Sequence, residues 1–98
     1  NCKKMKLPSE FYIGSIKWTI VENNHLLDEL KLMGLCEFPK SKISIYTNGI
    51  NNDLIEQTIY HEAVHAILES MGEFELTNND KFVQTFSLLL HQFEKSKK

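Results

Sequence analysis

The strongest structural signal in this sequence is a long helical pattern that runs from Asp53 to Met71. Asn51 or Asn52 can cap its start, and Gly72 follows at a position suited to end a helix. Its apolar side consists of Ile55, Ile59, Ala66 and Ile67. A chain of 98 residues has room for a single domain with one modest core. We therefore expect this helix to be a main element of one small domain.

Shorter segments before this helix predict two strand regions and one more helix. Phe11–Val21 is rich in aromatic and β-branched residues, which predicts one or two strands with a bend or hairpin turn at Gly14. Asn24–Met33 has apolar residues at helical spacing, and Gly34 suits a C-cap, so a short helix is predicted there. Lys42–Thr47 predicts a further strand.

A last helix is predicted from about Asp80 to Glu94, capped by Asn78 or Asn79. Its apolar residues fall on one broad face, formed by Phe82, Phe86, Leu89 and Phe93. The resulting order β, α, β, α, α predicts a small α+β fold. We expect one domain over residues 1–98, with residues 1–9 and 95–98 frayed.

The composition argues against several kinds of partner. The net charge is −2 and all 11 basic residues are lysines, whereas arginine is the usual residue for bidentate contacts with nucleic acid. No apolar run approaches the roughly 18 residues that a membrane span needs. We therefore expect no nucleic-acid partner, no membrane partner and a cytoplasmic location. Two cysteines, Cys2 and Cys36, do not form a disulfide framework and are expected to be reduced thiols.

The middle of the long helix carries the motif His61-Glu62-Ala63-Val64-His65. Residues four apart lie on one face of a helix, about 6 Å apart along its axis, so two imidazoles there can converge on one metal ion. Glu62 is rotated by about 100° from His61, which directs its carboxylate toward a water on the metal. Zinc lowers the pKa of such a water, and the carboxylate can accept its proton during attack on a carbonyl.

The segment 59–68 resembles the active-site helix of small phage and bacterial metallopeptidases, minimal zincins distantly related to the ImmA/IrrE and SprT types. The likeness covers most of the chain after Phe11, through Gly72-Glu73 and a second helix that opens at 79–83 and closes at 89–92. It implies a minimal zincin-like α+β domain, in which a small sheet packs on the HExxH helix and a C-terminal helix. It also implies that a strand beside the active-site helix pairs with an extended peptide. We expect that strand to be Lys42–Thr47.

A catalytic zinc ion normally has three protein ligands and a water, so a third ligand is needed. Six residues after His65, where metzincins carry a histidine, the chain has Met71. Glu69 lies on the same helix, but about 12 Å along the axis from His61, which is too far for one ion. In the family that the chain resembles, the third ligand is an acidic residue two positions before a Phe-Val pair, which corresponds to Asp80. The alternatives are Glu75, Glu73 and His91.

The sequence thus predicts a zinc-dependent peptidase in which His61, His65 and Asp80 hold Zn²⁺ and Glu62 is the general base. The expected substrate is a protein or peptide. The resemblance suggests a phage or mobile-element setting, with an adaptor or repressor protein as a partner. The alternative is a zinc-binding regulatory or interaction module without turnover. Glu62 argues against that alternative, because a purely structural zinc site has no use for it.

Overall fold

The computed structural model describes residues 7–97, which form one sheet and a layer of helices. The elements in chain order are β1 (Glu10–Ile13), β2 (Ile16–Glu22), α1 (Leu26–Leu30), β3 (Gly34–Glu37), a 3-10 turn (Phe38–Lys40), β4 (Lys42–Ile45), α2 (Asn52–Ser70), α3 (Phe74–Thr77) and α4 (Asp80–Ser96).

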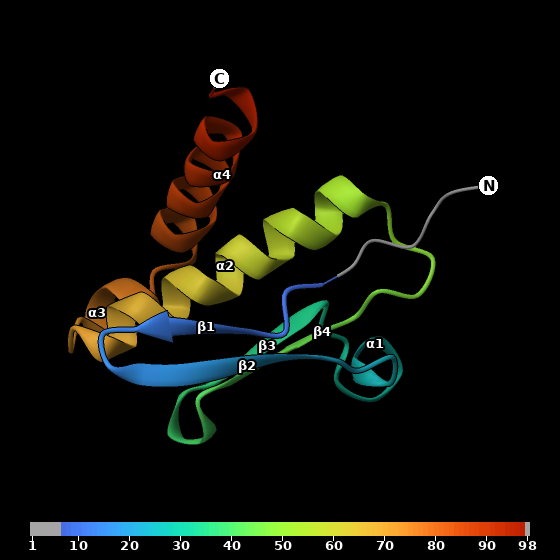
Figure 1. Ribbon diagram of the computed structural model, residues 1–98, viewed down its shortest axis with the longest axis horizontal. Coiled ribbons are helices and arrows are strands. Elements are labelled where there is room, and N and C mark those ends of the chain that lie inside the picture. The colour runs from blue at the N-terminus through green and yellow to red at the C-terminus, as the bar shows by residue number, and fades with distance from the viewer. Residues whose placement is uncertain (1–6, 98) are drawn as a thin grey trace.

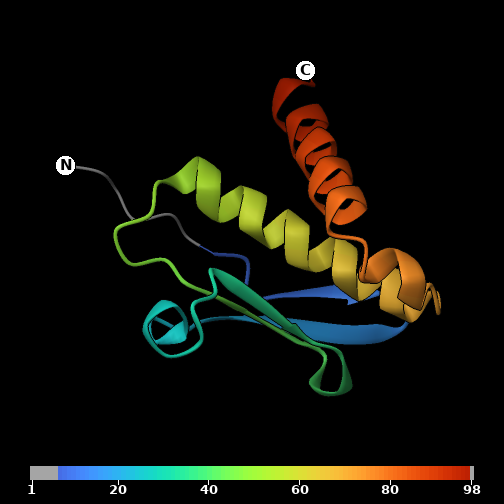
Figure 2. The ribbon, with the colours of Figure 1, turned by 180° about the vertical axis from the view of Figure 1, so that it is seen from behind.

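The four strands lie in the order β1-β2-β4-β3. β1 is antiparallel to β2 and β3 is antiparallel to β4, whereas β2 and β4 run parallel. Parallel neighbours need a crossover connection, and here α1 and β3 lie within it. α2 lies across one face of the sheet, and α4 packs on α2 away from the sheet (Figure 1 and, from behind, Figure 2). The predicted α+β class is confirmed, in the form of a small mixed sheet with helices.

Of the alternatives predicted for Phe11–Val21, one or two strands with a bend or a hairpin turn, the structure shows two strands joined as a hairpin. Gly14 joins β1 to β2 with a φ of 62°, a backbone conformation that glycine adopts without steric cost. The alternation along β2 buries Trp18 and Ile20, which pack with Ile43 and Ile45 of β4. The same alternation places Ile16 on this face, but Ile16 is 54% exposed because it lies at the turn end of the strand.

α2 agrees with the predicted long helix to within one residue at each end. The side chain of Asn51 accepts a hydrogen bond from the backbone N–H of Leu54, at 2.9 Å, and so caps the start. At the other end Gly72 has a φ of 78°, and the next N–H donates to the carbonyl of Leu68. Ile55 and Ala66 complete the core between α2 and the sheet.

The segment between β2 and β4 differs from the prediction. α1 is Leu26–Leu30 rather than Asn24–Met33, and Lys31, with a φ of 59°, follows its last turn. Leu26 is buried, whereas the other leucines of α1 are exposed, so one anchor residue rather than a whole apolar face holds this helix. Gly34 does not cap the helix but begins β3, a four-residue strand that the sequence did not predict.

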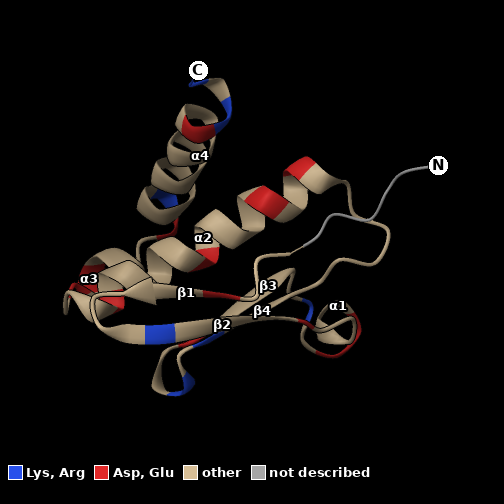
Figure 3. Cartoon of the chain, in the orientation of Figure 1, with Lys and Arg blue, Asp and Glu red and all other residues tan. Residues whose placement is uncertain are grey.

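α4 begins at the predicted residue, where the side chain of Asn79 accepts a hydrogen bond from the N–H of Phe82. Its predicted apolar face is not the face that packs in the core. The residues of α4 buried against the rest of the protein are Val83, Ser87 and His91. Phe86, Leu89 and Phe93 are exposed, and the charged residues of α4 lie near its two ends (Figure 3).

The ends of the chain were expected to be frayed. Residues 1–6 and 98, and with them Cys2, lie outside the described residues. Lys95 and Ser96 are helical, so α4 continues two residues beyond the predicted end at Glu94. Within residues 7–97, no helix has the length and apolar character that would let it cross a membrane.

The position of Gly34 gives a stability prediction. A Cβ at this position would lie 2.8 Å from Cγ2 of Thr58 and 3.0 Å from Cγ of Glu62, both on α2. We expect Gly34→Ala to lower the free energy of unfolding by about 1–3 kcal/mol, the usual effect of overpacking. Thr58→Ser removes the nearest atom but keeps the hydroxyl that donates to the carbonyl of Leu54.

Gly34→Ala combined with Thr58→Ser should therefore recover part of this loss, as measured by urea unfolding in a double-mutant cycle. The recovery is only partial because the Glu62 contact remains. Additive effects of the two substitutions would show that β3 does not press against α2 at this point.

Candidate active site

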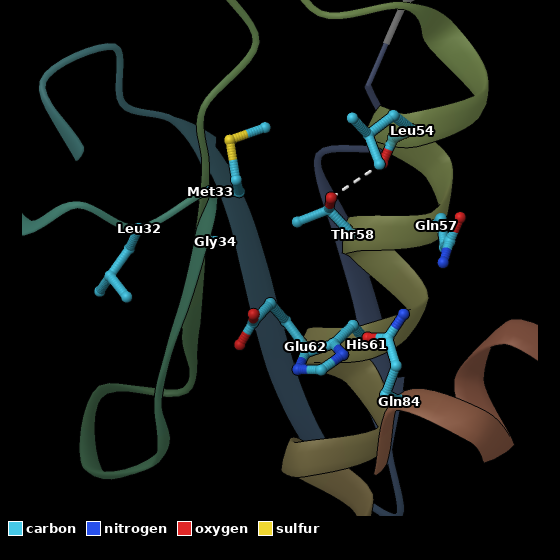
Figure 4. A pocket seen from close by; sticks show the side chains of 9 residues that line it. All are labelled: Leu32, Met33, Gly34, Leu54, Gln57, Thr58, His61, Glu62 and Gln84. Carbon is cyan, nitrogen blue, oxygen red and sulfur yellow. Dashed lines mark hydrogen bonds between the residues drawn. The ribbon is translucent and has the colours of Figure 1, made fainter. Parts of the chain in front are cut away.

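The HExxH motif lies in the middle of α2, beside β3. His61 and His65 are on one side of the helix, and the centroids of their rings are 5.0 Å apart. Glu62 is only 8% exposed, and its carboxylate projects from α2 into the space in front of β3 (Figure 4). As helix geometry predicts, the two imidazoles share one side of α2, whereas the buried carboxylate of Glu62 projects in a different direction.

A cleft extends along β3 on both sides of Glu62. Its two arms, of about 310 and 340 Å³, share Leu32, Gly34, His61 and Glu62. The first arm is mostly apolar and amide-lined, with Met33, Leu54, Gln57, Thr58 and Gln84. The second arm is more polar, with Leu35, Cys36, His65, Glu69, Thr77 and Asn78. The motif thus lies at the centre of an open groove.

β3 is the strand that borders this groove. β4 is hydrogen-bonded to β2 on one side and to β3 on the other, so it has no free edge within the described sheet. The expectation that Lys42–Thr47 pairs with a peptide is therefore wrong. β3 is an edge strand, and it is β3 that packs beside α2. The sequence could not show this, because strand order depends on the crossover and not on local pattern.

Burial dominates the electrostatics of the groove. It raises the pKa of the Glu62 carboxyl to about 7, since a charged carboxylate is disfavoured where water is excluded. The pKa of Cys36, across the groove on β3, rises to about 12, first through burial and then through the negative charges of Glu69 and Glu62. Cys36 is a free cysteine held as the neutral thiol.

Thr77 contacts the second histidine of the motif. Its Oγ1 lies 2.7 Å from Nδ1 of His65, and Thr77 is itself buried, with 6% of its surface exposed. When Nδ1 carries the proton and donates it to this hydroxyl, the lone pair of Nε2 is left for a metal ion. Burial lowers the pKa of His65, and the nearby His61 lowers it further. The neutral imidazole that metal binding requires is therefore favoured.

Asp80 lies close enough to His65 for its carboxylate to raise the pKa of that imidazole, against the effect of burial. Within residues 7–97, however, no three His, Cys, Asp or Glu side chains are grouped closely enough to hold a metal ion. Two of the three predicted ligands, His61 and His65, are thus brought together. The assignment of Asp80 as the third stays a prediction.

The structure places the other candidates for the third zinc ligand in three different parts of the fold. His91 is buried on α4, where its Nε2 is 3.0 Å from Oε1 of Glu56. Its ring lies against Tyr60, the residue immediately before the motif. Glu73 and Glu75 lie at the exposed start of α3. Glu69, which helix geometry excluded as a ligand, lines the second arm of the cleft.

Two residues of this site, Gly34 and Thr77, are not among the site residues predicted from the sequence. Gly34 was assigned to a helix end, although a lone glycine before an apolar segment is also typical of a close backbone approach. Thr77 lies in α3, a four-residue helix too short for any periodic signal. Only the return of the chain from α2 to α4 brings Thr77 to His65.

No protein-family model matches the chain, and comparison with curated proteins and with solved structures gave no match. The function of this chain is therefore inferred from the geometry and chemistry of its own residues.

The contact between Thr77 and His65 gives a prediction about metal affinity. Thr77→Val keeps the size of the side chain but removes the hydroxyl that orients the imidazole, so zinc affinity should fall by about 10- to 100-fold. Thr77→Ser keeps the hydroxyl and should stay near the wild type. Competition with a chromophoric zinc chelator measures both. Equal affinities in Thr77→Val and the wild type would show that the hydroxyl does not position His65.

Proposed function

We propose that this chain is a zinc-dependent peptidase built on a minimal zincin-like domain. The observation that carries the proposal is the position of Glu62, a carboxyl held between an imidazole pair and the edge of a sheet. A helix face with two imidazoles 5.0 Å apart, centroid to centroid, suits a shared zinc ion. A general base must also lie within reach of the reacting atoms, and Glu62 lines both arms of the cleft.

The donor set fits a catalytic zinc better than a structural one. Structural zinc sites are closed by four protein ligands, commonly including cysteines, whereas catalytic sites have three and stay open. Here His61 and His65 would hold the metal from α2, Thr77 would orient His65, and Asp80 is our choice for the third ligand. The bound metal would supply a Lewis acid and a water that ionises near neutral pH.

The protein's own groups then account for the remaining chemistry. Glu62 accepts a proton from the attacking water and can return it to the leaving amine, the two roles of one general acid–base. In this arrangement its carboxylate, which projects from α2 toward β3, acts as the base and not as a ligand (Figure 4). Burial of Glu62 removes competing water and keeps the proton transfer local.

The edge of β3 accounts for recognition of a peptide. An edge strand presents unpaired backbone N–H and C=O groups, which an extended chain can join as a further strand. Gly34 and Cys36 of β3 both line the cleft, so a peptide paired there would lie in front of Glu62. Backbone pairing gives affinity with little dependence on sequence, which suits a protein or peptide substrate.

Two substitutions test zinc binding and peptide hydrolysis separately. His61→Ala should abolish stoichiometric zinc binding, measured by metal analysis after dialysis against a chelator. Glu62→Gln should keep the zinc and the fold while lowering peptide hydrolysis by several orders of magnitude, because it removes the base and not a ligand. A fully active Glu62→Gln variant would exclude the proposed base. Wild-type protein that binds both zinc and peptides but cleaves none would favour the module without turnover.

The third ligand needs a test of its own. Asp80→Ala should weaken zinc binding about as much as loss of a histidine, with little loss of stability, because Asn79 still caps α4. Glu75→Ala and His91→Ala are the matched controls and should keep the wild-type zinc affinity. If Asp80→Ala retains that affinity and a control loses it, the ligand is the residue replaced in that control.

A further inference from the structure

α4 carries an apolar stripe that no other described element covers. Phe86, Leu89 and Phe93 are 49%, 57% and 59% exposed, and Phe82, at the start of the same stripe, is partly buried. α2 packs instead against the side of α4 that holds Val83. Lone exposed apolar residues are ordinary, but a contiguous row of large ones on a single helix marks an interaction surface.

The spacing of the stripe is that of a helix-pairing seam. Its residues follow one another at intervals of four, three and four, which is the alternation of the two core positions of a heptad. Between Lys81 and Glu94 the helix has no lysine, arginine, aspartate or glutamate (Figure 3). A second helix could therefore lie along the stripe without burying a charge, which would be costly.

We propose that this stripe is a dimer interface, in which α4 packs antiparallel on α4 of a second copy of the chain. A twofold interface uses the same patch on both copies and must be self-complementary. The order four, three, four reads the same in both directions, so an antiparallel pairing sets each Phe82 beside the partner's Phe93. It likewise sets each Phe86 beside the partner's Leu89. A stripe that paired with a different protein would not need this symmetry.

The shape of the exposed surface of α4 agrees with antiparallel pairing. A shallow hollow of about 400 Å³ borders the first three residues of the stripe, Phe82, Phe86 and Leu89. Phe93, the most exposed of the four, lies at the C-terminal end of the stripe, beyond this hollow. Antiparallel packing brings the Phe93 ring of each copy to the hollow of the other. A parallel pairing would set ring against ring and hollow against hollow.

The surface area that the two copies can bury sets the expected affinity of the dimer. Three side chains about half exposed offer roughly 300 Å² of apolar surface per copy, since a large aromatic side chain has about 150–250 Å² to bury. With the flanking polar residues, both copies together would bury on the order of 1,000 Å², the low end for specific interfaces. We therefore expect a reversible dimer with a dissociation constant in the micromolar range.

This interface is independent of the proposed peptidase. Gln84, which lines the cleft, is rotated by roughly 170° around α4 from the middle of the stripe, at 100° per residue. The dimer would therefore leave the groove along β3 open. A failed test of dimerisation would therefore leave the proposed zinc binding and hydrolysis unaffected, and the reverse also holds.

Sedimentation velocity of the whole chain, from roughly 1 to 500 µM, tests the proposal within the range where a weak interface of this area equilibrates. We expect a concentration-dependent shift from monomer to dimer. Leu89→Glu, at the centre of the seam, should raise the dissociation constant at least tenfold. The matched control is Leu30→Glu on α1, because Leu30 is equally exposed, at 55%, and should leave the equilibrium unchanged. Circular dichroism confirms that both variants are folded.

Three outcomes would overturn the proposal. The first is a wild type that stays monomeric throughout, which would leave the stripe to a different occupant. The second is a dimer that survives Leu89→Glu, and the third is a dimer that Leu30→Glu weakens equally.

Nitroxide labels then test the orientation, with Lys81→Cys as the labelled residue in a background where Cys2 and Cys36 are serine. Antiparallel packing places the two copies of residue 81 about 20 Å apart along the helix axis, at 1.5 Å per residue. Labels side by side would exclude the antiparallel arrangement.

Discussion

The packing of α2 against the edge strand β3 at Gly34 is the contact on which the rest of this structure depends. A strand and a helix can approach this closely only where the strand has no side chain, and a Cβ at Gly34 would overlap atoms of Thr58 and Glu62. The approach buries Glu62 and forms one wall of the cleft. β3 is at the same time the edge of the sheet, with its outer backbone groups free of any described strand.

Burial of Glu62 works against the stability of the domain. A carboxyl with 8% exposure forms no ion pair within the part of the chain that the structure describes, and its pKa rises because burial disfavours the charge. A purely structural role would be served better by an apolar residue at this position. Strained or costly residues tend to cluster where a protein acts on something else, which is consistent with the function that we propose.

α4 is an amphipathic helix whose more apolar face is exposed and whose more polar face is buried. Its most apolar face, which carries Phe86, Leu89 and Phe93, is turned to solvent. Its buried side contains Val83, a serine and a histidine, and that histidine is held by Glu56 of α2. The interaction between His91 and Glu56 fixes which side of α4 faces α2, because a buried imidazole needs a polar partner and Glu56 supplies one. The apolar stripe is then left exposed, which is where we propose that a second copy packs.

The sequence by itself determined α2, the hairpin and the starting point of α4, because local signals specify each of them. Asn51 and Asn79 cap helices through their own side chains, Gly14 turns the hairpin, and the spacing of the motif places His61 and His65 on one side of α2. These features need only neighbours a few residues away.

The tertiary structure alone decided which strand borders the groove, which residue orients His65, and which face of α4 is buried. Each of these depends on segments far apart in the chain. β3 is too short for a periodic signal and becomes the edge only through the crossover between β2 and β4. Thr77 reaches His65 only after the chain has turned back from α2. Apolar periodicity shows that a helix has two faces, but the partner across the interface determines which of them is covered.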